Sequence, residues 1–412
     1  MLSSRLPKDL SPSPFFAELE RVKASVLAEC AGTNAVPFID MTVSSPVKAG
    51  LPIDMDMAVE EARKDFGCWN PDAAGWKSAR EAVVEYYRER GGNFDAGQII
   101  LTASTSEAYS VLFKAFCDPG DVILTPMPGY PLLDTLAQLE HLECAPYFLK
   151  LARDKRGAEF RFVLDTDSLL AAPEKAKILL LVSPHNPTGH CVSRTEWNEV
   201  VSFCEQHNLI LVVDEVFGDY GISDDVRRTW EFVPGLCHPE RNEVKSKDLG
   251  PKCPIFWLNG LSKAVGSPQL KLGWMAFYAP EEQFEPIRAA LEFVEDAYLS
   301  VSAPAQALGS SLLKQSAAYE SQVRERLLTN WNTLRQAFPS KYCPEVIGGW
   351  YAAIRLGEDD EQLTLELLQA QHVLVQPGFF FDFDEDGWVV VSLLQEPALF
   401  KEAVARMTRP SC

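Results

Sequence analysis

The N-terminal part of the chain combines a helical pattern with a polar loop. Apolar residues recur with helical spacing over residues 15–30, a loop punctuated by Ser and Pro follows at 40–46, and helical spacing resumes at Met55. These features predict an arm and linker over residues 1–65, which we expect to contribute to a small domain.

The middle of the chain alternates short apolar runs with helical patterns. Runs of strand length occur at 99–101, 122–124, 178–182, 209–213, 255–258 and 274–277. The runs are continuous rather than alternating, which is typical of strands covered on both faces. The pattern therefore predicts an α/β domain with a mostly parallel sheet between helices.

The C-terminal part predicts a second unit. A long helical region covers roughly residues 281–338, and a smaller α+β segment follows, with strands near 348–356 and 388–394. We expect a large domain over 66–295 and a C-terminal small domain over 296–412. Residues 222–253 interrupt the alternation with charge, Gly and Pro, and we expect a long surface excursion there.

Charge and cysteine usage narrow the functional classes. The 412 residues carry a formal net charge of −20, which opposes binding to nucleic acid and to anionic membranes. The chain has no apolar run of membrane-spanning length and no signal-peptide pattern, so we expect a cytoplasmic protein. Its ten cysteines form no C-x-x-C pair, so we expect neither a metal site nor a disulfide framework.

Two polar segments follow predicted strands at positions where ligands of open α/β sheets bind. Ser104, Thr105 and Ser106 lead from a strand into a helix, whose free N–H groups suit a phosphate. An ordinary helix cap with Glu107 explains the same residues. Asn186 lies between two prolines that fix its backbone, which fits either an oriented side chain or a plain turn.

Two further segments place ionisable groups at strand ends. Asp214 closes an apolar strand, and a buried carboxylate needs a cationic or hydrogen-bonding partner, such as a protonated pyridine nitrogen, a helix N-terminus or an arginine. Lys263 follows another strand among small residues, where burial would lower the pKa of its amine as nucleophilic catalysis requires. Taken alone, a solvated surface lysine is the commoner explanation.

Together, in this order and spacing, the four segments resemble the class I/II aminotransferases of the fold-type I pyridoxal-phosphate enzymes, over nearly the whole chain. The resemblance implies pyridoxal 5′-phosphate as cofactor. It also implies a large domain with a mostly parallel seven-stranded sheet between helices, and a smaller α+β domain built from the N- and C-terminal segments.

The resemblance assigns roles to individual side chains. Lys263 would hold the cofactor as a Schiff base and then move the proton between substrate and cofactor. Asp214 would keep the pyridine nitrogen protonated, Asn186 would donate to the ring O3′, and Tyr130 would stack on the ring. Ser104, Thr105 and Ser106 would form the phosphate cup, completed by Ser262 and Lys271.

Several positions depart from the family pattern. Lys271 replaces the usual arginine, which keeps the charge but loses the bidentate fork. Gly260 replaces a phosphate-binding serine, Ser44 replaces the glycine of the substrate loop, and Trp69 replaces a tyrosine that reaches the partner subunit's phosphate. We therefore expect fewer contacts to the phosphate than in typical relatives.

Two departures concern chemistry directly. Phe217 replaces a tyrosine that commonly gives O3′ a second hydrogen bond. Val390 stands where the resemblance leads us to expect the arginine that binds the substrate α-carboxylate, so ordinary amino-acid recognition is in question.

The sequence thus predicts an aminotransferase that moves an amino group from an amino acid or amine to a keto acid or aldehyde. A decarboxylase or lyase using the same cofactor is the alternative, and a cofactor-binding regulator without catalytic activity is a third. The resemblance also implies a homodimer.

Overall fold

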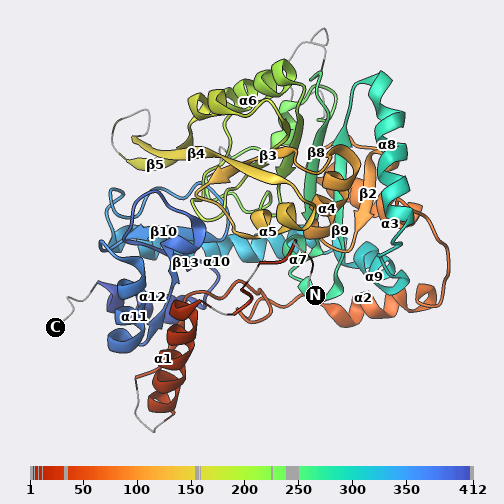
Figure 1. Cartoon of the computed structure of the whole chain (residues 1–412). Helices are drawn as coiled ribbons and strands as arrows, with labels where there is room; N and C mark the ends of the chain where they lie inside the picture. The colour runs from red at the N-terminus through yellow and green to blue at the C-terminus, as the bar shows by residue number, and fades with distance from the viewer. Residues whose placement is uncertain are drawn as a thin grey trace.

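The computed structural model describes residues 3, 5–7, 9–11, 13–31, 36–153, 157, 159–223, 226–237 and 250–408. Its largest feature is an eight-stranded sheet with the order β2-β9-β8-β7-β6-β3-β4-β5 (Figure 1). The strands of this sheet are β2 (Ile99–Thr102), β3 (Val122–Met127), β4 (Glu143–Arg153), β5 (Phe160–Leu164), β6 (Ala176–Val182), β7 (Ile210–Asp214), β8 (Ile255–Gly260) and β9 (Gly273–Tyr278).

The inner strands of the sheet are parallel, from β4 through β3, β6 and β7 to β8. β9 pairs antiparallel with both β8 and β2, and β5 pairs antiparallel with β4. The predicted α/β fold with a mostly parallel sheet is therefore confirmed.

Helices cover both faces of this sheet because its side chains alternate between two apolar clusters. On β6, Leu179 and Leu181 belong to one cluster, whereas Ile178 and Leu180 belong to the other. The chain's α-helices are α1 (Pro14–Cys30), α2 (Met55–Ala62), α3 (Lys77–Glu89), α4 (Thr105–Phe116), α5 (Leu132–Leu139), α6 (Arg194–His207), α7 (Leu261–Ala264), α8 (Glu281–Asp296), α9 (Ala303–Leu313), α10 (Ser316–Ala337), α11 (Asp360–Gln371) and α12 (Pro397–Met407).

Two small sheets lie outside the large sheet, and one of them joins the N-terminal segment to the C-terminal part of the chain. β10 (Tyr351–Arg355), β13 (Trp388–Ser392) and β12 (Gln376–Pro377) form one, and β1 (Ile39–Asp40) pairs with β11 (Val373–Leu374) in the other. Helix α1 packs on α11, so the red N-terminal helix lies against the blue C-terminal elements in Figure 1. Short 3₁₀ segments complete the described elements: Arg63–Asp65, Ala96–Gln98, Thr166–Ala171, Thr229–Phe232, Pro268–Leu270 and Gly378–Phe381.

One detail differs from the sequence expectation. The sheet has eight strands rather than seven, because the half-exposed β4–β5 hairpin lacks a continuous apolar run and adds an edge. The helical region expected over roughly residues 281–338 consists of three helices, α8, α9 and α10. Of the expected excursion at 222–253, residues 224–225 and 238–249 lie outside the described residues.

Within the described part of the chain, no helix is both long enough and apolar enough to cross a membrane.

Candidate active site

A cavity of about 290 Å³ lies at the carboxyl ends of the central parallel strands, where Val182, Asp214 and Gly260 terminate β6, β7 and β8. The cavity gathers nearly all of the residues singled out from the sequence. Those on its wall are Ser44, Ser104, Thr105, Ser106, Tyr130, Asn186, Asp214, Phe217, Ser262, Lys263 and Lys271. Trp69 lies elsewhere.

The start of α4 forms one end of the cavity. The Ser104 hydroxyl caps the helix by accepting from the Glu107 N–H at 3.2 Å, which is the ordinary capping role that the sequence allowed. The N–H groups of the first helical turn still point toward the cavity end, where an anion is favoured. The helix start therefore combines a conventional cap with a surface suited to a phosphate.

Two glycines allow backbone segments to pack closely around this end of the cavity. A Cβ added to Gly273 would lie 3.0 Å from the Ser104 carbonyl carbon and 3.1 Å from the Thr105 nitrogen. A Cβ on Gly260 would lie 3.0 Å from the Gly273 Cα. Gly260, which replaces a serine of the family pattern, therefore serves close strand packing in this chain.

Asp214 is held by two hydrogen bonds. The Tyr109 hydroxyl donates to Asp214 Oδ2 at 2.8 Å, and the Val216 N–H donates to Oδ1 at 3.0 Å. Burial raises the pKa of the Asp214 carboxyl, whereas these two donors and the Lys263 charge lower it. The carboxylate is thus oriented and lies where a cation would be stabilised.

Lys263 is buried between Asp214 and two aromatic rings. Its Nζ lies 4.9 Å from the Trp350 ring centre and 5.5 Å from that of Phe217. Burial lowers the pKa of the Lys263 amine to about 8, although Asp214 opposes the shift. The Tyr220 hydroxyl donates to the Lys263 carbonyl at 2.5 Å and fixes the backbone. The amine is therefore partly deprotonated near neutral pH, as a nucleophile requires.

Asn186 has an unsatisfied buried acceptor. Its Oδ1 atom is buried without a hydrogen-bond partner, although the side chain lines the cavity. The loop around it is pinned because the His185 N–H donates to the His190 carbonyl at 2.7 Å and the Gly189 N–H to the His185 carbonyl at 2.8 Å. A buried polar group of this kind is normally completed by a ligand or water.

The open side of the cavity carries hydroxyl groups. Tyr130 is 49% exposed, and the Gly129 N–H beside it donates to the Phe381 carbonyl at 2.8 Å. Tyr351 lies on the opposing small sheet; burial raises the pKa of its phenol to about 12, and a hydrogen bond with Ser44 lowers it. The small domain therefore supplies part of the cavity wall.

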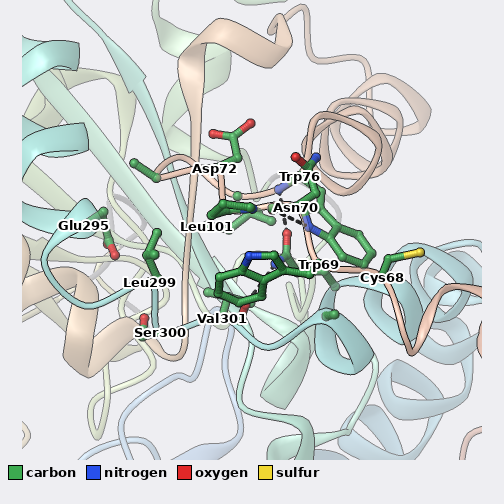
Figure 2. A pocket seen from close by; sticks show the side chains of 15 residues that line it. Cys68, Trp69, Asn70, Asp72, Trp76, Leu101, Glu295, Leu299, Ser300 and Val301 are labelled. Atoms are coloured by element: carbon green, nitrogen blue, oxygen red, sulfur yellow. Dashed lines mark hydrogen bonds between the residues drawn. The ribbon is translucent and has the colours of Figure 1, made fainter.

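Trp69 borders a different, smaller pocket of about 40 Å³ (Figure 2). Its side chain is 81% exposed and lies with Leu299, Ser300 and Val301 in the lining of that pocket. Glu295 also lines it and has a buried Oε1 without a hydrogen-bond partner. Within this single chain, Trp69 does not reach the cavity that holds Lys263.

Several residues of this cavity were not predicted from the sequence. Tyr109 and Tyr351 line it, and Trp350 contacts Lys263 from behind the wall. Tyr109 lies four residues after Thr105, so helical spacing alone would have placed the two on one face. Tyr351 and Trp350 come from a distant segment and gave no such signal.

Comparisons with known proteins identify the same family as the sequence motifs. Residues 59–407 match the sequence model of the family "Aminotransferase class I and II". The chain belongs to the class I and II aminotransferases. The resemblance drawn from the four strand-end segments is therefore confirmed.

Individual relatives and solved structures agree with the family. Alanine aminotransferase of Mycobacterium tuberculosis is 28% identical over 326 residues, covering 76% of this chain and 71% of the relative. Glutamate-pyruvate aminotransferase of Haemophilus influenzae is 25% identical over 354 residues, covering 82% and 81%. Alanine aminotransferase from Pyrococcus furiosus shares the fold with a TM-score of 0.81 at 21% identity, over 99% of this chain and 98% of that one.

As a member of this family, the chain is a transaminase that depends on pyridoxal 5′-phosphate. The cavity residues suit that cofactor: an oriented carboxylate for the ring nitrogen, a buried lysine, a helix start for the phosphate, and an asparagine with an unsatisfied amide. When bound, the cofactor supplies an electron sink for the carbanion that transamination requires.

Proposed function

We propose that Lys263 is the residue to which the cofactor is attached and the group that moves the proton during amino transfer. The observation that carries the proposal is a buried lysine whose amine has its pKa lowered to about 8 and faces the oriented Asp214 carboxylate. An amine with this pKa both attacks a carbonyl and accepts or returns a proton near neutral pH.

Asp214 would hold the proton on the ring nitrogen. Two donors fix its orientation, the Tyr109 hydroxyl and the Val216 N–H. An ionised carboxylate at this depth favours a cation beside it, which keeps the nitrogen protonated while the ring accepts electrons.

The remaining cavity residues would bind and orient the cofactor and the substrate. The N–H groups and hydroxyls of Ser104, Thr105 and Ser106, with Ser262 and the Lys271 charge, would hold the phosphate. Asn186 would donate to the ring oxygen O3′ and contact the substrate, and Tyr130 would stack on the ring. Ser44 would line the substrate side, and Phe217 would pack beside O3′ without donating to it.

We further propose that the protein forms a homodimer in the cytoplasm. Each chain would divide into domains over residues 1–65, 66–295 and 296–412. Large apolar side chains near the smaller pocket support the dimer: Trp69 and Phe293 are each 81% exposed, and Tyr298 is 57% exposed. In a dimer, Trp69 would contact the partner subunit. The described cysteines are all free, which fits a reducing compartment.

An absorbance experiment tests the assignment of Lys263. The cofactor-loaded enzyme is mixed with single amino donors, both amino acids and simple amines, and the shift from the aldehyde to the amine form of the cofactor is followed. We expect the wild type to convert and Lys263→Ala to lose the lysine-linked spectrum and the conversion, whereas Lys64→Ala, an exposed lysine, behaves as the wild type. A Lys263→Ala enzyme that converts at the wild-type rate would refute the assignment. Carbon dioxide or an elimination product without conversion would favour the decarboxylase or lyase alternative.

A further inference from the structure

The charges on the cavity wall leave no cation for a substrate. Among the described residues that line the cavity, the charged side chains are Lys263, Lys271 and Asp214. On the proposed function, Lys271 serves the phosphate, and Lys263 and Asp214 serve the reacting centre. The remaining side chains on the substrate side are hydroxyls and apolar groups, including Ser44, Tyr351 and Leu133. A carboxylate placed there would be desolvated without a charged partner.

The strand register places further uncharged side chains behind Tyr351, outside the cavity lining. Tyr351 pairs with Ser392 and Ala353 pairs with Val390, so these four side chains share one face of the β10–β13 pair. Ala353, Val390 and Ser392 are at most 3% exposed, and none is cationic. The next residue on this face of β10, Arg355, is already bound to the Glu385 carboxylate. The small-domain wall thus offers a substrate no free arginine among the described residues.

Two aromatic rings lie beside Lys263, Phe217 on the cavity wall and Trp350 behind it. Trp350 and Phe217 lie within 5.5 Å of Lys263 Nζ, measured to their ring centres, and the two rings lie 5.3 Å apart. Such rings favour ammonium groups and apolar substituents over anions.

Two exposed acidic residues, Asp134 and Asp382, adjoin residues near the open side of the cavity along the chain. Asp134 follows Leu133 of the wall, and Asp382 follows Phe381, whose carbonyl is bound to the Gly129 N–H next to Tyr130. Burial and the nearby Asp134 both raise the pKa of Asp382, which indicates that the two carboxyls are neighbours. With the chain's net charge of −20, this surface attracts ammonium groups and repels carboxylates.

We propose that the amino donor is a primary amine whose amino-bearing carbon carries no carboxylate, and that the acceptor is an aldehyde. This inference rests on the proposed transamination. The donor R–CH₂–NH₂ gives its nitrogen and two electrons to the cofactor, whose aldehyde is reduced to an aminomethyl group. Water supplies the oxygen of the product R–CHO. An acceptor aldehyde then takes the nitrogen and the electron pair to become an amine, and the cofactor aldehyde is restored.

Matched pairs that differ only in the α-carboxylate test the proposal: ethylamine and L-alanine, isobutylamine and L-valine, 2-phenylethylamine and L-phenylalanine. With the cofactor-loaded enzyme, calorimetric titration gives the Kd of each compound, and single-turnover absorbance gives its conversion. In at least one pair, we expect the Kd of the amine to be lower than that of its amino acid by a factor of about ten or more. Equal or tighter binding of the amino acid in every pair, or no binding of any amine, would overturn the proposal. Tighter amine binding without conversion would uphold the substrate class and instead refute transamination.

Variants of Asp134 and Asp382 supply a second measurement of the substrate preference. Asp134→Asn and Asp382→Asn should each reduce the preference for amine over amino acid about two- to threefold at low ionic strength, and added salt should remove the effect. Glu325→Gln, an exposed charge on α10, is the control and should leave the preference unchanged. If the preference for amine over amino acid is unchanged in both variants, the proposed role of these carboxylates in substrate selection is contradicted.

Discussion

The hydroxyl of Tyr109 donates a 2.8 Å hydrogen bond to Asp214 Oδ2, and both side chains are buried. Tyr109 comes from α4, whose start forms one end of the cavity, whereas Asp214 ends a central strand. One contact therefore links two parts of the candidate cofactor site. Burial and the Asp214 charge raise the pKa of the Tyr109 phenol far above its usual value, so it remains a donor at all ordinary pH values.

Removing this donor should weaken both cofactor binding and catalysis. In Tyr109→Phe, Asp214 loses a hydrogen bond to a charged acceptor, worth about 1.5–3 kcal/mol. We expect the cofactor Kd to rise and the single-turnover rate to fall, each by about tenfold or more. The control is Tyr147→Phe, which removes a buried phenol that donates to the Leu180 carbonyl away from the cavity. Equal effects of the two variants on cofactor affinity would contradict the positioning role.

The stability of the cofactor-free enzyme should depend on Lys263 and pH. The folded state lowers the pKa of the lysine from 10.5 to about 8, so below pH 8 a charged amine is buried at a cost. The unfolded chain binds more protons between pH 8 and 10.5, so this contribution to stability rises over that range. Lys263→Met should be more stable than the wild type by about 3 kcal/mol at pH 7, with the difference vanishing above pH 10.5.

Chemical unfolding of the two proteins as a function of pH measures this effect, with Lys64→Met as the exposed control. A stability difference that does not change with pH would show that packing, rather than charge burial, separates the variants.

Glu295 should make the enzyme less stable as pH rises. Burial, and then the nearby Glu107, raise the pKa of the Glu295 carboxyl from 4.5 to about 8. The folded state therefore holds the proton more tightly, and stability falls as pH increases from 4.5 to 8. Glu295→Gln should raise the Tm by roughly 2–5 °C at pH 8.5 and have little effect at pH 4.5.

The matched control is Glu292→Gln, one turn earlier on α8, where the carboxylate pairs with Arg288 near the surface. Thermal unfolding at the two pH values tests the prediction, and a gain of the same size at both would argue against a titrating Glu295.

A hydroxyl introduced at Phe217 should change the titration of the lysine-linked cofactor. Phe217 lines the cavity and offers no donor to the ring oxygen O3′. A tyrosine hydroxyl in its place would stabilise the anionic form of that oxygen, which accompanies loss of the proton from the lysine linkage. We expect Phe217→Tyr to move the spectral transition to lower pH, whereas Phe293→Tyr on the exposed surface should not. An unchanged transition in Phe217→Tyr would mean that the new hydroxyl does not reach O3′.

Much of the cofactor site could be predicted from local sequence. Asp214 ends a continuous apolar strand, Lys263 follows another, and Ser104 precedes a helix, so each is placed by the period and end of its own element. Because the carboxyl ends of parallel strands meet at one edge, these separate signals converge on a single cavity.

The substrate side of the cavity depended on the tertiary structure. Tyr351 reaches the cavity from β10 of a separate small sheet, and Trp350 lies against Lys263 although the two residues are 87 positions apart in the chain. Trp69, in contrast, stays outside the cavity. The sequence by itself determined the α/β architecture and placed the candidate cofactor residues at the ends of its strands, because periodicity and strand ends are local properties. Only the tertiary structure decided which distant side chains face the substrate, because that depends on how the small sheet packs against the large one.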